Sequence, residues 1–178
     1  MSIFKRKETI IEQPIEEYEV EEIEKMDIQR VRVEGAYLIL DDGKIAINKA
    51  DTIGLHKVDD TYYLNCSQGI INEDIAQSKD KHIAVAKLKD IYHKLKAMGM
   101  HNFAVIDSRL VNLNNVTNLR RESFGYNDNY VMIELKNGAE LFVRTGDMAS
   151  TGKLLRNIKR QIDEYNQIKA SQQELQSI

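Results

Sequence analysis

Apolar and polar residues alternate in short runs along the chain, separated by longer stretches in which apolar residues recur at helical spacing. The clearest alternation lies at 129–144, where two apolar segments flank Lys136-Asn137-Gly138. Asn-Gly between two such segments is typical of a β-hairpin turn, because both residues adopt positive φ readily. A helical pattern follows from about Asp147. Its apolar positions are Leu154, Leu155, Ile158, Ile162 and Tyr165.

The first half of the chain predicts a similar series of elements. Asp41-Asp42-Gly43 and Asp59-Asp60 are typical turn sequences between strands. The segment 67–81 is polar and predicts a loop, and a helix is predicted over 81–98, where Gly99 ends it. Strands are predicted at Ile28–Val33, Tyr37–Leu40, Lys44–Ile47, Asp51–Val58 and Thr61–Cys66.

The second half starts the pattern again, with strands predicted at His101–Ile106, Leu110–Leu113 and Val116–Arg121 before the Asn-Gly hairpin. Ile47–Leu55 matches Val111–Leu119 in pattern, at an offset of about 64 residues. This match predicts a structural repeat; the alternative is that commonplace patterning produced two similar meanders. The predicted fold is α+β, with an acidic N-terminal tail or helix at 1–27. Two β-meander-plus-helix units follow at 28–100 and 101–170, and a frayed tail at 171–178.

This order of elements resembles the bacterial pleckstrin-homology-like domains. The resemblance rests on Asn114–Leu119, Tyr130–Val143 and Leu154–Ile162, with a weaker echo over 36–98. It implies a β-roll closed by a C-terminal helix and a role in binding or assembly rather than catalysis. Each copy has only about 60–70 residues, which is short for a complete seven-stranded roll. A simpler β-meander-plus-helix unit therefore remains open.

Charge is distributed unevenly, although the net value is only −3. Residues 1–35 hold 6 Lys/Arg against 10 Asp/Glu. After Pro14, a glutamate-rich segment predicts a helix with Ile15, Tyr18, Ile23 and Met26 on one side, or an edge strand. Its glutamates form either a solvated face or an acidic peptide that docks on a basic partner surface.

The remaining composition favours a protein of a reducing compartment. Cys66 is the single cysteine, which excludes an internal disulfide. The basic N-terminus is not followed by the apolar core of a signal peptide, and no apolar run reaches the length of a membrane span. We expect a cytoplasmic protein, or a virion component if a phage encodes it. The Asn/Ile/Lys-rich composition suits a low-GC Gram-positive bacterium or its phage.

Motifs that would carry chemistry are weak. Gly146–Lys153 has the glycines and lysine of a phosphate-binding loop, but Leu154 follows Lys153 where a nucleotide site needs Ser or Thr. A capped strand-to-helix turn is the better interpretation, with an incidental anion site as the alternative. Histidines 56, 82, 93 and 101 lack metal-ligand spacing. We therefore predict no catalytic residue, metal or cofactor and expect no small-molecule ligand, although missing motifs do not exclude an unfamiliar enzyme site.

Basic residues and loop aromatics gather in the second half. The candidate binding residues are Arg120, Arg121, Phe124, Tyr126, Arg144, Lys153, Arg156 and Arg160. They form either a solvated helix face or a surface for an acidic protein, a nucleic acid or a phospholipid. The hypothesis is a non-enzymatic protein–protein interaction module, structural or regulatory and possibly phage-encoded, that binds a partner or itself. The alternative is a nucleic-acid-binding protein that uses the basic face of the second unit.

Overall fold

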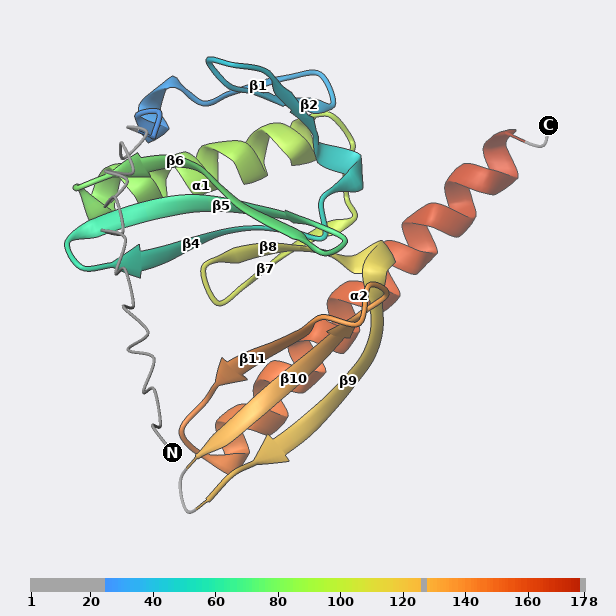
Figure 1. Cartoon of the computed structure of the whole chain (residues 1–178). Helices are drawn as coiled ribbons and strands as arrows, with labels where there is room; N and C mark the ends of the chain where they lie inside the picture. Colours follow the sequence, from blue (N-terminus) through green and yellow to red (C-terminus); the bar gives the residue numbers. More distant parts are fainter. Residues whose placement is uncertain (1–24, 126–127, 177–178) are drawn as a thin grey trace, which may run out of the picture.

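The first layer of the molecule is a small three-stranded sheet. In the computed structural model, which describes residues 25–125 and 128–176, β1 (Arg32–Glu34), β2 (Tyr37–Ile39) and β3 (Lys44–Ala46) pair antiparallel in chain order (Figure 1). A 3-10 turn, η1 (Ile28–Arg30), precedes them, so the strand predicted from Ile28 begins only at Arg32. The helix or strand predicted over 15–26 lies almost entirely outside the described residues.

The second layer is a five-stranded antiparallel sheet in the order β6-β5-β4-β8-β7. Its strands are β4 (Thr52–Val58), β5 (Thr61–Gln68), β6 (Ile71–Ser78), β7 (Phe103–Ile106) and β8 (Arg109–Asn112). Helix α1 (Lys81–Ala97) packs on it, as its apolar spacing predicts. Asp80 caps the start of α1, and Gly99 follows its end with a φ of +76°.

Strand β6 contradicts the prediction of a loop over 67–81. Asn72 and Glu73 are exposed, and β6 is the edge of its sheet, so polar side chains there meet water on much of their surface. A β-bulge in the pairing of β5 with β6 places Ile75 and Ala76 side by side in the core, which breaks the alternation of apolar and polar residues. For these two reasons, the sequence of β6 lacks the alternation of a strand and resembles that of a loop.

The third sheet has the order β11-β10-β9 and carries the second helix. Its strands are β9 (Val116–Ser123), β10 (Asn129–Leu135) and β11 (Glu140–Arg144), followed by α2 (Met148–Gln176). The hairpin between β10 and β11 turns through Asn137 and Gly138, as predicted, and Gly138 has a φ of +82°. Ile158 and its apolar neighbours on α2 pack against the sheet.

The end of α2 differs from the predicted frayed tail. The helix continues to Gln176, and Figure 1 shows its last turns extending away from the sheets. Glutamine, glutamate and leucine, which make up 172–176, are all good helix formers, and no glycine or proline interrupts them. Apolar side chains are sparse there, so a pattern-based prediction ends the helix too early.

Hairpin β7–β8 belongs to two hydrophobic cores at once. Phe103 and Leu110 pack in the first core with α1, while Ala104, Ile106 and Val111 pack in the second core with α2. The same hairpin pairs with β4, so the boundary between 100 and 101 does not separate two independent sheets. The predicted α+β class is confirmed. Two further 3-10 turns, η2 (Ile47–Lys49) and η3 (Leu113–Asn115), precede β4 and β9.

Among the described residues, no helix is both long enough and apolar enough to cross a membrane.

Candidate interaction surfaces

Alternation along β10 decides which side chains of the third sheet face α2. Val131 and Ile133 are buried in one cluster with Ile158 of α2. Successive side chains of a strand point to opposite faces. Tyr130 and Met132 therefore lie on the outer face of the sheet, together with their cross-strand partners Arg144 and Phe142.

Three aromatic rings form a cluster on this outer face. Phe124, Tyr130 and Phe142, which we call the aromatic plate, have ring centroids 5.5, 5.8 and 6.2 Å apart. Met132 is 0% exposed although it lies on the outer face, whereas Phe124 is 65% exposed. The aromatic plate thus presents apolar surface to solvent on a sheet face that α2 does not cover.

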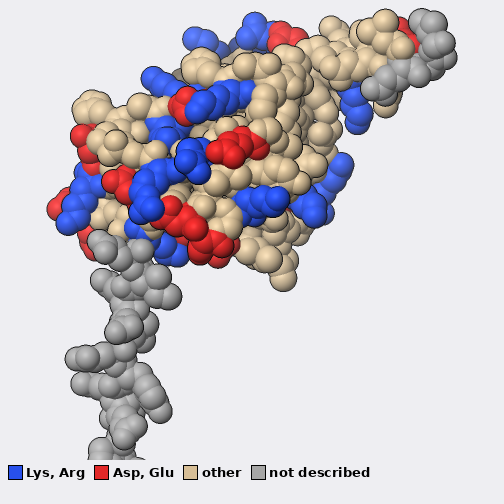
Figure 2. Space-filling view, turned by 90° about the horizontal axis from the view of Figure 1, so that it is seen from above, with Lys and Arg blue, Asp and Glu red and all other residues tan. Residues whose placement is uncertain are grey.

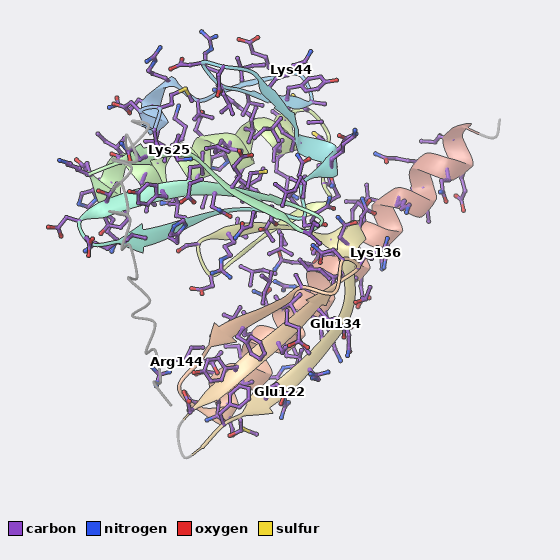
Figure 3. The ribbon with its side chains drawn as sticks, in the orientation of Figure 1. Lys25, Lys44, Glu122, Glu134, Lys136 and Arg144 are labelled. Atoms are coloured by element: carbon purple, nitrogen blue, oxygen red, sulfur yellow. The ribbon has the colours of Figure 1, made fainter. Side chains whose placement is uncertain are left out.

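Ion pairs surround the aromatic plate. Arg144 lies 3.2 Å from a carboxylate oxygen of Asp128, which also accepts a 2.7 Å hydrogen bond from the Tyr130 hydroxyl. This hydrogen bond raises the pKa of Tyr130. Arg120 pairs with Glu122 and, at 3.5 Å, with Glu140. Glu122 and Arg144 occupy the end of the sheet farther from the five-stranded sheet (Figure 3).

The opposite face carries the other predicted basic residues. Arg121 points toward α2, where one of its guanidinium nitrogens is 3.2 Å from the position that a Cβ on Gly152 would take. A guanidinium nitrogen of Arg156 lies 3.4 Å from the same position. Lys153 and Arg160 line a shallow depression on α2 with Arg156. The sheet therefore separates Arg120, Phe124 and Arg144 from this group, and Tyr126 lies outside the described residues.

The start of α2 is a capped helix rather than a nucleotide site. Asp147 Oδ1 accepts a 2.8 Å hydrogen bond from the backbone N–H of Ser150, and Oδ2 accepts a 2.6 Å bond from its hydroxyl. These hydrogen bonds lower the pKa of Asp147. Lys153 lies inside the helix, so Gly146–Lys153 is the strand-to-helix turn that its sequence favours.

The paired acidic residues and the histidines do not assemble a metal site in the described part of the chain. Asp41-Asp42 and Asp59-Asp60 lie at the predicted turns, and Asp59 has a φ of +51°. His56 stacks on Tyr63 at 5.4 Å and lies 3.5 Å from Asp74. His82 and His93 are exposed on α1.

The region of sheet β1–β3 carries charged side chains of both signs. Viewed from above, Lys and Arg lie among Asp and Glu over much of the visible surface (Figure 2). Ion pairs account for part of this pattern, with Arg30 at 2.8 Å from Asp41 and Arg32 at 3.5 Å from Glu34. Such a mixed surface has little attraction for a polyanion.

A hydrogen-bond network at the junction of the two halves escaped the sequence-based predictions. Asp51, which is 5% exposed, accepts hydrogen bonds from the Gly69 N–H at 2.7 Å, the Asn115 amide at 2.6 Å and the Asn137 amide at 3.0 Å. Asn137 also donates to the Gly69 carbonyl at 2.6 Å. The sequence signal is weak, because Asp51, Asn115 and Asn137 are residue types that are common in any turn.

Cys66 is a buried thiol of β5. Burial, followed by the charges of Glu73 and Asp51, raises the pKa of this thiol to about 12. The thiolate is the reactive form of cysteine. We expect Ellman's reagent at pH 8 to modify Cys66 only as fast as the protein unfolds, and to react promptly in 6 M guanidinium chloride. Rapid modification of the folded protein would contradict this assignment.

Comparisons with protein-family models, curated proteins and solved structures found no match to this chain.

Proposed function

We propose that this protein is a non-enzymatic binding module that recognises a protein partner through the aromatic plate. The observation that carries this proposal is the position of Phe124, Tyr130 and Phe142 over a buried Met132, on the face of the third sheet that lies away from α2. Aromatic and arginine side chains are enriched at the centres of protein interfaces. Exposed apolar clusters with a charged rim commonly mark such interfaces.

The charges around the aromatic plate favour a protein over a nucleic acid. Arg120 and Arg144 are both paired with acidic side chains of the chain itself. A nucleic-acid surface needs unpaired cations beside its aromatic rings. Arg121 and Arg156, which form no ion pair with an acidic side chain among the described residues, lie on the other side of the sheet. We therefore propose a protein, rather than a nucleic acid, as the ligand of the aromatic plate.

The proposal includes a tandem arrangement of two pleckstrin-homology-like units. Support comes from the order strand, strand, 3-10 turn, three strands and helix, which describes β2 to α1 and again β7 to α2. In this alignment Ile47 corresponds to Leu113 rather than to Val111. Five strands per unit remain fewer than the seven of a complete roll, so an incomplete version of that fold is what we propose.

Affinity capture from the native cell tests the aromatic plate. We expect the wild-type protein to recover one partner, or a second copy of the chain. The amount recovered should fall at least tenfold with Phe124→Ser combined with Phe142→Ser. Tyr37→Ser is the matched control, since Tyr37 and Phe142 are both 39% exposed. Equal recovery with both variants, or a partner lost only with Tyr37→Ser, would contradict the proposal.

A further inference from the structure

The strongest unassigned feature is the group of basic side chains on the α2 face of the third sheet. Arg121 from β9 and Arg156 from α2 both reach Gly152, and Lys153 neighbours it in sequence. These three side chains have no ion-pair partner among residues 25–125 and 128–176. By contrast, Arg160 pairs with Glu164 at 3.6 Å.

Convergence of two guanidinium groups without an acid between them is unfavourable. Two like charges a few ångströms apart repel by on the order of 1 kcal/mol or more at a protein surface. A carboxylate placed between them replaces this repulsion with two charge-assisted hydrogen bonds. Gly152 has no side chain, which leaves room for both arginines at one point of the helix. This geometry suits an acidic side chain as the ligand.

The depression beside these arginines has both polar and apolar walls. It runs along one face of α2, and its lining comprises Ser150, Lys153, Leu154, Arg156, Asn157 and Arg160. Leu154 offers apolar contact between the basic groups. An occupant that complements this surface carries several carboxylates and a few apolar side chains, as an amphipathic acidic segment does.

The chain itself contains such a segment outside the described residues. Residues 12–24 hold seven glutamates together with Ile15, Tyr18, Val20 and Ile23. We infer that this glutamate-rich N-terminal segment binds the Arg121–Lys153–Arg156 surface. Lys25 lies near α1 in the upper part of the molecule, and α2 begins in the lower part (Figures 1 and 3). A fully extended stretch of 13 residues spans about 45 Å, so this chain length allows the glutamates farthest from Lys25 to contact α2 of the same molecule. A second copy of the chain can supply the segment equally well.

Nucleic acid is the competing ligand for a basic surface. The rings that could stack on bases, Tyr130 and Phe142, lie on the outer face of the third sheet, away from Arg121 and Gly152. Stacking supplies much of the affinity for single strands. An acidic peptide needs no aromatic platform, so the arrangement favours the peptide.

Zero-length carbodiimide crosslinking of the full chain tests this inference, because the reagent joins lysine and glutamate only in direct contact. We expect mass spectrometry to identify bonds between Lys153 and glutamates of 12–24. These bonds should fall at least fivefold with Arg121→Glu combined with Arg156→Glu, which keeps Lys153. The control is Arg30→Glu with Arg32→Glu, the same charge change at η1 and β1, and it should leave the bonds in place. Circular dichroism confirms that each variant is folded.

Two further measurements keep the inference falsifiable if the charge reversals unfold the protein. Gly152→Ala should raise the melting temperature, since alanine favours the helix by up to about 1 kcal/mol, and yet lower the crosslink by moving Arg121. An equimolar 20-nucleotide single strand at 0.15 M salt should leave the crosslink intact. Four results would overturn the inference. The Lys153 bonds are absent, or they decrease neither in the double arginine variant nor in Gly152→Ala. Alternatively, they decrease equally in the control, or the oligonucleotide prevents them from forming. The mass of the crosslinked species separates binding within one molecule from binding between copies, and either result supports it.

Discussion

Replacing Asp51 by alanine is expected to lower the free energy of unfolding by about 3 kcal/mol. Its carboxylate accepts hydrogen bonds from Gly69, Asn115 and Asn137, which belong to three turns far apart in sequence. Removal of the acceptor leaves the Gly69 N–H and the Asn115 amide without this partner in a partly buried region, and the Asn137 amide keeps only its bond to the Gly69 carbonyl. A hydrogen bond to a charged group contributes about 1.5–3 kcal/mol. Urea unfolding followed by circular dichroism measures the loss.

Two variants show whether this loss comes from the network. Asp60→Ala removes a fully exposed carboxylate at another turn and should change stability by less than about 0.5 kcal/mol. A double-mutant cycle of Asp51→Ala with Asn137→Ala should give a coupling energy above about 1 kcal/mol, because the two side chains share a hydrogen bond. Additive effects would show that the two halves do not depend on this contact.

Replacing Phe103 by alanine is expected to destabilise both halves of the molecule together. Phe103 is almost completely buried against the first core, although it belongs to the hairpin whose other face forms part of the second core. Deletion of a buried phenylalanine ring costs about 3–5 kcal/mol. The expected result is one unfolding transition at a lower urea concentration, with helix content and Cys66 reactivity changing at the same midpoint.

Val105→Ala is the matched control for Phe103→Ala. Val105 lies on the same strand but is 48% exposed, so its truncation should cost less than about 1 kcal/mol. Two separate transitions in the Phe103 variant, with Cys66 exposed while the helix signal of α2 persists, would contradict the idea that β7–β8 joins the two cores.

Local signals in the sequence were sufficient for most of the individual elements. Asn137-Gly138, Asp59-Asp60 and Asp41-Asp42-Gly43 mark turns because few residues tolerate the backbone angles or supply the side-chain hydrogen bonds that turns need. Helix α1 was predicted because its buried residues recur every three to four positions. Strand β6 was missed because an edge strand with a bulge does not alternate regularly.

The candidate site was predicted less well, for a geometric reason. Arg120 and Arg121 are adjacent in sequence, yet consecutive residues of a strand point to opposite faces of a sheet. One arginine therefore joins the aromatic plate and the other joins α2. A cluster of like residue types in sequence says little about a surface until the register of each strand is known. The sequence also does not show which arginines form ion pairs. Arg120 and Arg144 pair with acidic side chains, whereas Arg121 and Arg156 converge on Gly152.

Hairpin β10–β11 and the start of α2 are the part of this protein that its sequence determined most completely. Turn residues and apolar spacing act over a few neighbours, so β10, β11 and α2 follow from local chemistry. Tertiary structure alone decided that β7–β8 would complete the sheet of the first half and that Asp51 would meet Asn115 and Asn137. Those contacts depend on where separate elements come together, and commonplace turn residues such as Asp and Asn do not encode a partner.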